Sequence, residues 1–348
     1  YQALGADTKG SHNVAVGIYA LQTQNFTSAT DAYNTAVGYN AGGAVTTGTE
    51  NTLIGGLAGD ALTDADYNVA VGRGALTTDT LGSRNTAVGR NALSSQNFTS
   101  ATDSYNTAVG FEAGSVITTG TNNTLIGGLA GDALTDGGTN VAIGSESLSA
   151  EQSGGENVAV GHAASAQQNG GANNTSIGTL AGYQITTGDN NLSLGHDAAR
   201  TGSPGGAVQT GSNQICLADE NITHAYVQVD WSIASDQRDK TDFTALDLGL
   251  DFVKALAPVT YKWDKRSKYG DKSAEDYDLA AQTPDGTHKE DWLDIGFKAQ
   301  EVEALEIAAG YNKSNSTNLV SSHTDDGKQM GLQYSKFVPI LVKAIQEQ

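Results

Sequence analysis

The sequence predicts a mainly β protein in which a parallel β-roll of about 17-residue repeats is followed by a small α+β domain. Two observations lead to this fold class. A short motif returns at a fixed spacing through roughly the first two-thirds of the 348 residues. The composition also changes after Ala234, because 36 of the 43 glycines precede that point and the later part has the mixed composition of an ordinary globular domain.

The repeated motif is Asn-Thr/Val-Ala/Leu-Val/Ile-Gly, first present at residues 13–17. Eleven copies follow one another, and successive asparagines lie 17 residues apart except for two steps of 21. The eleven asparagines are Asn13, Asn34, Asn51, Asn68, Asn85, Asn106, Asn123, Asn140, Asn157, Asn174 and Asn191. Residues 25–31 also return as residues 97–103, which is 72 positions later. A period near 17 is too short for a pair of helices and is typical of a β-solenoid.

Each repeat is predicted to contain a strand, because β-branched residues alternate after the asparagine. Glycine ends the strand, where a positive φ or a close approach between coils requires it. The asparagines are predicted to stack as a hydrogen-bonded ladder. A second apolar patch, such as residues 19–21, predicts a second strand in each coil. Coils about 4.8 Å apart would span about 50 Å, with the extra residues of the longer units projecting from one edge as loops.

The formal net charge is −20, from 19 basic and 39 acidic side chains. This charge argues against nucleic acid and anionic membrane surfaces as partners, because both attract clustered lysine and arginine. No run of 18 apolar residues is present, so no membrane insertion is expected. The single Cys216 excludes an internal disulfide and a cysteine-based zinc site. The chain begins at Tyr1 without a secretory signal, so we expect it to be part of a longer protein.

No cofactor and no metal site are predicted. The six histidines have no ligand spacing and are expected to be scattered surface residues. Residues 60–64 and their copy 132–136 each contain two aspartates, and a solvated turn is favoured there over a Ca²⁺ site between coils. Residues 72–74 lack the third glycine of a nucleotide-binding loop. Aromatic side chains on the longer units are candidates either for receptor contact or for covering the roll, namely Phe26, Tyr33, Phe98 and Tyr105.

The repeat resembles the left-handed parallel β-roll of trimeric adhesin heads of the YadA type, which also occurs in phage tail fibres. The resemblance rests on the Asn-x-Ala-Val-Gly unit and covers residues 1 to about 200. It implies a homotrimer. The strands agree with self-association, because apolar residues occupy both strand faces and a thin coil buries only one of them.

The chain is expected to divide into a β-roll domain (1–212), a β transition segment (213–234) and a terminal domain (235–348). Within the transition, residues 213–217 form a degenerate last repeat. Residues 225–231 alternate in polarity as a strand does.

Within the terminal domain, residues 246–256 carry apolar side chains at helical spacing and predict a helix. Residues 259–263 predict a strand, and the charged residues 264–291 predict a surface loop. Residues 294–302 continue the domain, and residues 334–345 predict a final helix.

The terminal domain is similar to the intramolecular chaperone of phage tail spikes and fibres, the S74 peptidase family. The similarity runs through residues 231–348 and includes a Ser-Asp-x-Arg-x-Lys box and a Leu-x-Pro-Val-x-Tyr-x-Trp strand. It also includes the Gly-Phe-x-Ala-Gln-Glu motif and the Tyr-Ser-Lys-x-x-Pro-x-Leu-x-Lys-Ala-Ile helix. Lys298 departs from the pattern, because an apolar residue is commoner there. Members of the family trimerise, help a β-rich fibre to fold, and then cut themselves off before the serine of the box.

The resemblance implies cleavage of the bond between Ala234 and Ser235. Ser235 would be the nucleophile and Lys240 its base, as in a serine peptidase that acts once on itself. A lysine is a base only in its neutral form, which burial or a neighbouring cation favours. Other residues of the motifs are expected to support the site: Asp236, Arg238, Gln300 and Glu301.

These resemblances imply the C-terminal part of a trimeric bacteriophage tail fibre or spike in the virion tail, with the rest of the fibre upstream. The β-roll is expected to attach to a host-cell surface receptor, either a polysaccharide or an outer-membrane protein. The last 114 residues are expected to drive trimerisation and folding and then to be released. One alternative is an adhesin or injection-machine fibre whose trimerisation domain stays uncleaved. Another is a polysaccharide depolymerase with its site between subunits.

Overall fold

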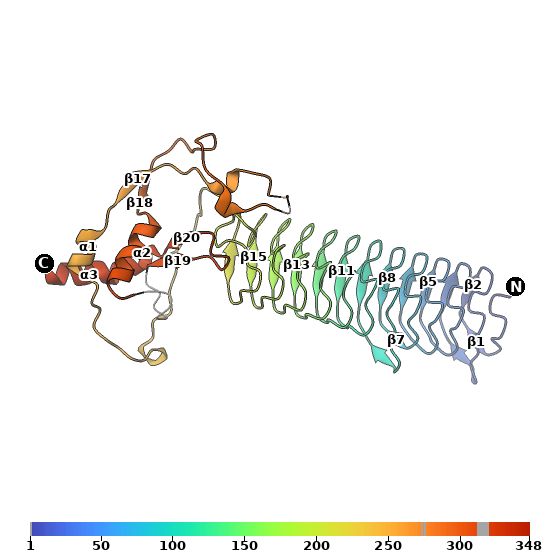
Figure 1. Cartoon of the computed structure of the whole chain (residues 1–348). Coiled ribbons are helices and arrows are strands. Elements are labelled where there is room, and N and C mark those ends of the chain that lie inside the picture. Colours follow the sequence, from blue (N-terminus) through green and yellow to red (C-terminus); the bar gives the residue numbers. More distant parts are fainter. Residues whose placement is uncertain (1, 273, 275, 312–319) are drawn as a thin grey trace. The chain divides into compact units, whose positions relative to one another are not determined.

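The computed structural model describes residues 2–272, 274, 276–311 and 320–348 (Figure 1). The chain forms two compact units, the first ending at Asp219 and the second running from Glu220 to Gln348. The first unit is a parallel β-solenoid of about eleven turns, and the second is a small α+β unit. The predicted class, a mainly β protein with a small α+β region at its C-terminal end, is confirmed.

One parallel sheet of twelve strands runs along the solenoid, and each coil contributes one three-residue strand (Figure 1). Neighbouring strands pair in the register set by the repeat, so that Thr107 lies opposite Thr124. The last strand follows Gln214, and the degenerate repeat therefore extends the sheet. In chain order the strands are β2 (Val14–Val16), β4 (Thr35–Val37), β5 (Thr52–Ile54), β6 (Val69–Val71), β8 (Thr86–Val88), β10 (Thr107–Val109), β11 (Thr124–Ile126), β12 (Val141–Ile143), β13 (Val158–Val160), β14 (Thr175–Ile177), β15 (Leu192–Leu194) and β16 (Ile215–Leu217).

The asparagines before the strands form a continuous ladder. Each side-chain Oδ1 accepts the backbone N–H of the next ladder residue at 2.9–3.1 Å, from Asn13 through to Gln214. Most of the side-chain amides also donate to a carbonyl group 14 residues later, as Asn51 does to Ala65 at 2.8 Å. The ladder satisfies backbone groups at the corner of each coil, where an unpaired buried N–H group would cost about 1–3 kcal/mol.

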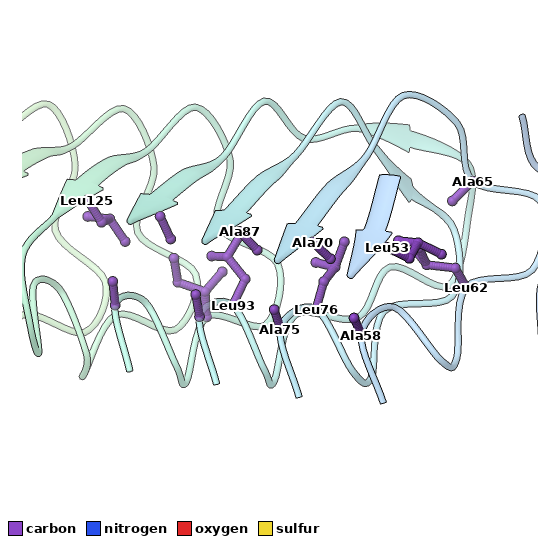
Figure 2. Close-up of a cluster of buried hydrophobic side chains, with 14 of the residues drawn as sticks. Leu53, Ala58, Leu62, Ala65, Ala70, Ala75, Leu76, Ala87, Leu93 and Leu125 are labelled. Atoms are coloured by element: carbon purple, nitrogen blue, oxygen red, sulfur yellow. The ribbon is translucent and has the colours of Figure 1, made fainter. Parts of the chain in front are cut away.

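The core of the solenoid is a single row of small and branched apolar side chains. The middle residue of a strand points into the coil, so Leu53, Ala70 and Leu125 are fully buried. Leucines from the following turn fill the space beneath the strands, as Leu62 and Leu76 do in Figure 2. The two flanking residues of each strand point outward, and this outer face of the sheet is half-exposed.

The second strand predicted in each coil is wrong. The apolar patch after the strand forms a turn in the described coils, and Tyr19 and Leu21 have φ angles of 65° and 49°. The physical reason is the narrow coil, which must reverse direction around a core one side chain thick. Left-handed backbone positions make that reversal possible, whereas an extended strand would not.

The two longer units project from one edge of the solenoid, where β1 and β7 stand out in Figure 1. Their extra residues form short parallel pairs between adjacent coils. The pairs are β1 (Gly10–Ser11) with β3 (Thr30–Asp31), and β7 (Gly82–Ser83) with β9 (Thr102–Asp103). Of the aromatic side chains there, Phe26 and Phe98 are buried and cover the roll, whereas Tyr33 and Tyr105 are exposed.

Two columns of side chains border the outer face of the sheet. The leading column holds the residue before each ladder position: His12, Tyr33, Glu50, Tyr67, Arg84, Tyr105, Asn122, Thr139, Glu156, Asn173, Asn190 and Asn213. The trailing column holds the residue after the position that closes each strand: Ile18, Tyr39, Gly56, Arg73, Arg90, Phe111, Gly128, Ser145, His162, Thr179, His196 and Asp219. Leading-column side chains contact one another, since Arg84 lies 4.6 Å from the Tyr67 ring and 5.9 Å from the Tyr105 ring.

An interior column repeats an acid and a glutamine at a spacing of 72 residues, beyond the two copies of the duplicated block. A buried acid follows every fourth coil, at Asp79 and Glu151, with Asp7 at the matching position near the start. A glutamine lies in the next coil each time, and Gln96 donates to Asp79 at 2.5 Å. Gln24 donates to Asp7 at the same distance.

The second unit is built from short elements. They are η1 (Gln237–Asp239), α1 (Leu250–Ala255), β17 (Val259–Tyr261), η2 (Arg266–Lys268), η3 (Leu279–Ala281), β18 (Asp294–Gly296), α2 (Ala299–Ala308), β19 (Ser321–His323), β20 (Met330–Leu332), η5 (Tyr334–Lys336) and α3 (Phe337–Glu347). β17 pairs antiparallel with β18, and β19 pairs antiparallel with β20. A small core joins α1, α2 and α3 through Phe252, Val302 and Ile340.

Three expectations for this unit change. The strand expected at residues 225–231 is wrong, since this segment is exposed and has no strand partner among the described residues. The helix expected over 246–256 is shorter, because Gly249 at its N-terminal cap has an extended φ of −133° and the helix begins at Leu250. The loop at 264–291 includes two short 3-10 turns, and its positions 273 and 275 lie outside the described residues.

Candidate functional site

A short turn brings Ser235 and Lys240 together. The 3-10 helix η1 occupies the residues between them, and Asp236 caps it by accepting the Arg238 backbone N–H at 2.9 Å. The Lys240 backbone N–H donates to Gln237 O and ends the turn. The Lys240 Nζ therefore lies 2.6 Å from the Ser235 Oγ, within hydrogen-bond distance. The sequence spacing required such a turn, and the structure shows which residues form it.

The bond that would be cut is accessible. Ala234, Ser235 and Lys240 are exposed in the single chain, and the segment on either side of them has no regular secondary structure apart from η1. An exposed peptide in an irregular segment can rotate its carbonyl carbon toward a neighbouring hydroxyl, which a strand or helix would prevent. The geometry therefore provides a nucleophile, an amine in contact with it and a free backbone.

Arg238 forms an ion pair with Asp236 and not a contact with Lys240. The guanidinium Nη2 lies 2.6 Å from Asp236 Oδ2, and Nε also donates to the same carboxylate. These hydrogen bonds hold the pKa of Asp236 below its usual range and raise the pKa of Arg238. Because Asp236 neutralises Arg238, this pair shapes the turn.

The other two expected supporting residues lie on the first turn of α2. Glu301 forms an ion pair with Lys298 at 2.7 Å, and Gln300 is exposed. No hydrogen bond or ion pair within residues 220–311 of the described chain links Gln300 or Glu301 to Ser235 or Lys240. Lys298, which departs from the family pattern, takes up the position before the helix and pairs with the acid three residues later.

The segments on either side of Ser235 and Lys240 carry large apolar side chains that are exposed to solvent. Tyr226, Val229, Trp231, Ile233 and Phe243 are 65–89% exposed. Isolated apolar side chains on a surface are ordinary, but a run of this kind marks an interaction site. Sequence reasoning missed this feature because alternating apolar residues were assigned to a strand. Their clustering around Ser235 was the available signal.

The described residues hold no group of three or more metal-ligating side chains. Asp64 accepts a hydrogen bond from Thr47 at 2.5 Å, and Asp60 accepts one from Asn40 at 3.2 Å, so this pair connects coils. In the copied block, burial raises the pKa of Asp132, with Glu112 and Glu146 adding to the effect. No helix of the described chain has the length and apolar character needed to cross a membrane.

Comparison with known families identifies the terminal unit. Residues 235–311 match the family described as the chaperone of endosialidase, the S74 peptidases. The C-terminal region therefore carries a domain of this family, as the sequence motifs predicted, and the match begins at Ser235. The solenoid that precedes it is compatible with a fibre-like head region. Searches of the curated proteins and of the solved structures found no match.

Proposed function

We propose that this chain is the C-terminal part of a trimeric phage tail fibre or tailspike that attaches to the host surface. Its terminal unit would assemble the trimer and then release itself by cutting between Ala234 and Ser235. The observation that carries this proposal is the 2.6 Å contact between Lys240 Nζ and Ser235 Oγ at the start of a domain of the chaperone family. The protein would act in the virion tail, with a polysaccharide or outer-membrane protein as its receptor.

The outer face of the solenoid sheet supports the trimer. Its side chains are mainly valine, isoleucine and threonine, and Val14, Val16 and Ile177 are 43–57% exposed. Twelve strands at a spacing of about 4.8 Å make this face about 53 Å long. A continuous apolar stripe of that length is larger than the patches usual on monomers, and three copies facing a common axis would cover it.

The terminal unit also supports association. Trp263, Trp292 and Ile295 are 44–76% exposed, and the buried core of the unit is small. Three terminal units that bury these side chains together would bring three chains into one place. That contact lowers the entropy cost of bringing the solenoids into register, because their coils then meet as parts of one assembly.

The dyad can cut the chain by a shift of the acyl group. Lys240 takes the proton of the Ser235 hydroxyl, and Oγ attacks the carbonyl carbon of Ala234 through a five-membered ring. The bond from that carbon to the Ser235 nitrogen then breaks, and the nitrogen leaves as an amine after taking a proton. Water hydrolyses the resulting ester, which restores the Ser235 hydroxyl and leaves a carboxylate on Ala234.

Assembly would control when this reaction occurs. In a single chain, Ser235 and Lys240 are exposed to water. Neighbouring subunits that cover residues 226–243 would remove this water and favour the neutral amine. Cleavage would therefore follow trimerisation, and the fibre would keep the register that the terminal units established.

The test is an SDS gel of freshly expressed protein. We expect pieces of 234 and 114 residues from the wild type and only the intact chain from Ser235→Ala and Lys240→Gln. Ser232→Ala is the matched control, because Ser232 is exposed, lies three residues earlier and should be cleaved as the wild type is. An uncleaved wild type in a trimer of correct mass would refute self-cleavage and favour the alternative of a permanent trimerisation domain.

A further inference from the structure

The two columns at the borders of the sheet continue its apolar face. Tyr33, Tyr67 and Tyr105 in the leading column and Tyr39 and Phe111 in the trailing column are 43–57% exposed. Among the large apolar side chains that are exposed in described residues 2–219, only Val116 lies outside the sheet face and these columns. The exposed apolar surface of the solenoid therefore consists of one face with two aromatic borders.

Rotational symmetry determines which residues of a neighbouring copy lie opposite the leading and trailing columns. If copies are related by rotation about an axis parallel to the solenoid, rotation leaves the height of every coil unchanged. It also brings the edge where strands begin on one copy to the edge where strands end on the next. A leading-column residue therefore faces the trailing-column residue of the same coil, six positions later in the sequence, on the neighbouring copy.

We propose that the two columns form the contact between neighbouring copies and fix their register, coil against coil. The proposal rests on the symmetric trimer proposed above and adds the residues that meet. The side chains that would lie opposite each other are chemically matched at four coils: Tyr33 with Tyr39, Tyr67 with Arg73, Tyr105 with Phe111, and Glu156 with His162. The matches are two aromatic pairs, a guanidinium against an aromatic ring, and an acid against a base.

Arg73 provides the most specific support. The solenoid unit has five basic side chains, and four of them have a partner within the chain. Lys9 donates to Thr27, and Arg84, Arg90 and Arg200 pair with carboxylates. The Arg73 side chain is exposed, and among the described residues it makes no hydrogen bond or ion pair, since only its backbone carbonyl accepts one, from Asn91. A tyrosine ring from the neighbouring copy supplies the partner that its own chain does not.

One coil places like charges opposite each other, Arg84 and Arg90, and the structure accounts for it. Arg84 Nε lies 3.0 Å from Asp103, and Arg90 Nη1 lies 3.2 Å from Glu112. Each guanidinium therefore brings its own carboxylate to the contact. The two residues can approach as neutral pairs, so this coil does not oppose the arrangement.

The columns also prevent the slip that the block duplication would otherwise allow. After a shift of four coils, strand residues meet equivalent residues, because the block repeats every 72 positions. The columns repeat only in part, because Tyr33 and Tyr39 have aromatic counterparts in Tyr105 and Phe111 one block later, whereas other positions change. Thr139 replaces Tyr67 and Ser145 replaces Arg73 one block later, so a slipped copy loses these matched contacts. Register is therefore specified at the borders of the sheet rather than on its face.

Cysteine cross-linking tests the arrangement in the full chain. In the double variant Glu156→Cys with His162→Cys, the two positions of one chain are separated by a strand and lie on the order of 15–20 Å apart. A disulfide needs Cα atoms within about 7 Å, so only neighbouring copies can form it. We expect mild oxidation with diamide to give a covalent trimer on a non-reducing gel. The off-register control is Glu156→Cys with Arg90→Cys, four coils apart, which should stay unlinked.

The outcomes separate this inference from the proposed function. A native mass of one chain overturns both, because no neighbouring copy is present. A trimer whose matched pair stays unlinked, or whose off-register pair links instead, overturns the inference and leaves the trimer standing. If the first double variant is insoluble, Tyr33→Cys with Tyr39→Cys gives the same test seven coils nearer the N-terminal end of the solenoid. The native Cys216 is buried in β16, and the wild type provides the control for it.

Discussion

The two units of this chain obtain their structure in opposite ways. In the solenoid, every coil repeats the hydrogen bonds and buried side chains of the coil before it, and the asparagine ladder runs without a break from Asn13 to Gln214. In the terminal unit, few contacts repeat, and large apolar side chains such as Trp231 and Ile295 are 74% and 76% exposed. Each coil of the solenoid is stabilised by its neighbours along the chain, whereas the terminal unit leaves large apolar side chains that the proposed trimer would cover.

This difference explains why the two units occur together. A repetitive structure has many contacts within each chain, but it specifies the register between chains only weakly, because many shifted arrangements resemble the native one. The terminal unit has contacts that do not repeat and therefore specify one arrangement, but its own hydrophobic core is small. In the proposed assembly, contact between the terminal units would align the solenoids, and removal of those units would then make unfolding hard to reverse.

The largest loss of stability is expected where adjacent coils of the solenoid approach most closely. Gly89 has a φ of 138°, and a Cβ there would lie 2.2 Å from the Gly110 carbonyl oxygen of the next coil. Gly89→Ala combines a backbone conformation reserved for glycine with a clash, so we expect a loss of roughly 3–6 kcal/mol in unfolding free energy. Gly128→Ala is the control, because nothing lies within 4 Å of a Cβ there. Equal denaturation midpoints for the two variants would contradict the close packing between coils.

A smaller effect is expected in the core of the terminal unit. Ile340 on α3 is 2% exposed, and Ile340→Ala should cost about 2–4 kcal/mol and reduce the yield of soluble protein. Ile345 on the same helix is 71% exposed, and Ile345→Ala should cost about 0.5 kcal/mol or less in the isolated unit. Chemical denaturation measures both. A similar cost for Ile345→Ala in the full protein would show that another subunit covers it and would sharpen the contrast between units.

The smallest effect concerns pH. The Leu250 backbone N–H donates to Glu347 at 2.7 Å and Lys343 lies 3.0 Å away, which together hold the pKa of Glu347 below its usual range. The folded pKa is lower than the unfolded value of about 4.3, so this stabilisation is present above pH 4.3 and is lost as pH falls through the folded pKa.

Glu347→Gln should therefore remove part of the pH dependence of the terminal unit. We expect the denaturation midpoint of the wild type to fall more steeply between pH 6 and pH 3 than that of the variant. Asp251→Asn provides a control, because Asp251 is an exposed carboxylate on α1. Parallel midpoint curves for the wild type and Glu347→Gln would show that the contact between Glu347 and α1 does not stabilise the unit.

The regular part of the fold was predictable because its signals are local and recur. Asparagine, a three-residue strand and glycine at a fixed spacing predicted the sheet, and the ladder follows from one residue at one phase. The second strand was predicted wrongly because Tyr19 and Leu21 occupy left-handed backbone positions, which their side chains ordinarily disfavour. Such positions are imposed by closure of the coil, and the available signal was the glycine that replaces Leu21 at the same place in other coils, as at Gly42 and Gly59.

The site was predictable only in part for a related reason. The box from Ser235 to Lys240 identified two side chains that the structure places in contact, because the residues that form the turn lie between them. Arg238 pairs with Asp236 instead, two residues earlier, which spacing does not reveal. The segment at 225–231 alternates as a strand does, but no strand in the described part of the chain pairs with it.

The buried acid and glutamine that return every fourth coil have a consequence for how such chains change over generations. A block of four coils contacts only the coil on either side, and the first two blocks, as far as Ala142, present nearly the same interior. Recombination that inserts or deletes 72 residues therefore leaves every junction intact and alters length in steps of about 19 Å. Shaft length in this class of protein can thus respond to selection without any new fold or new contact.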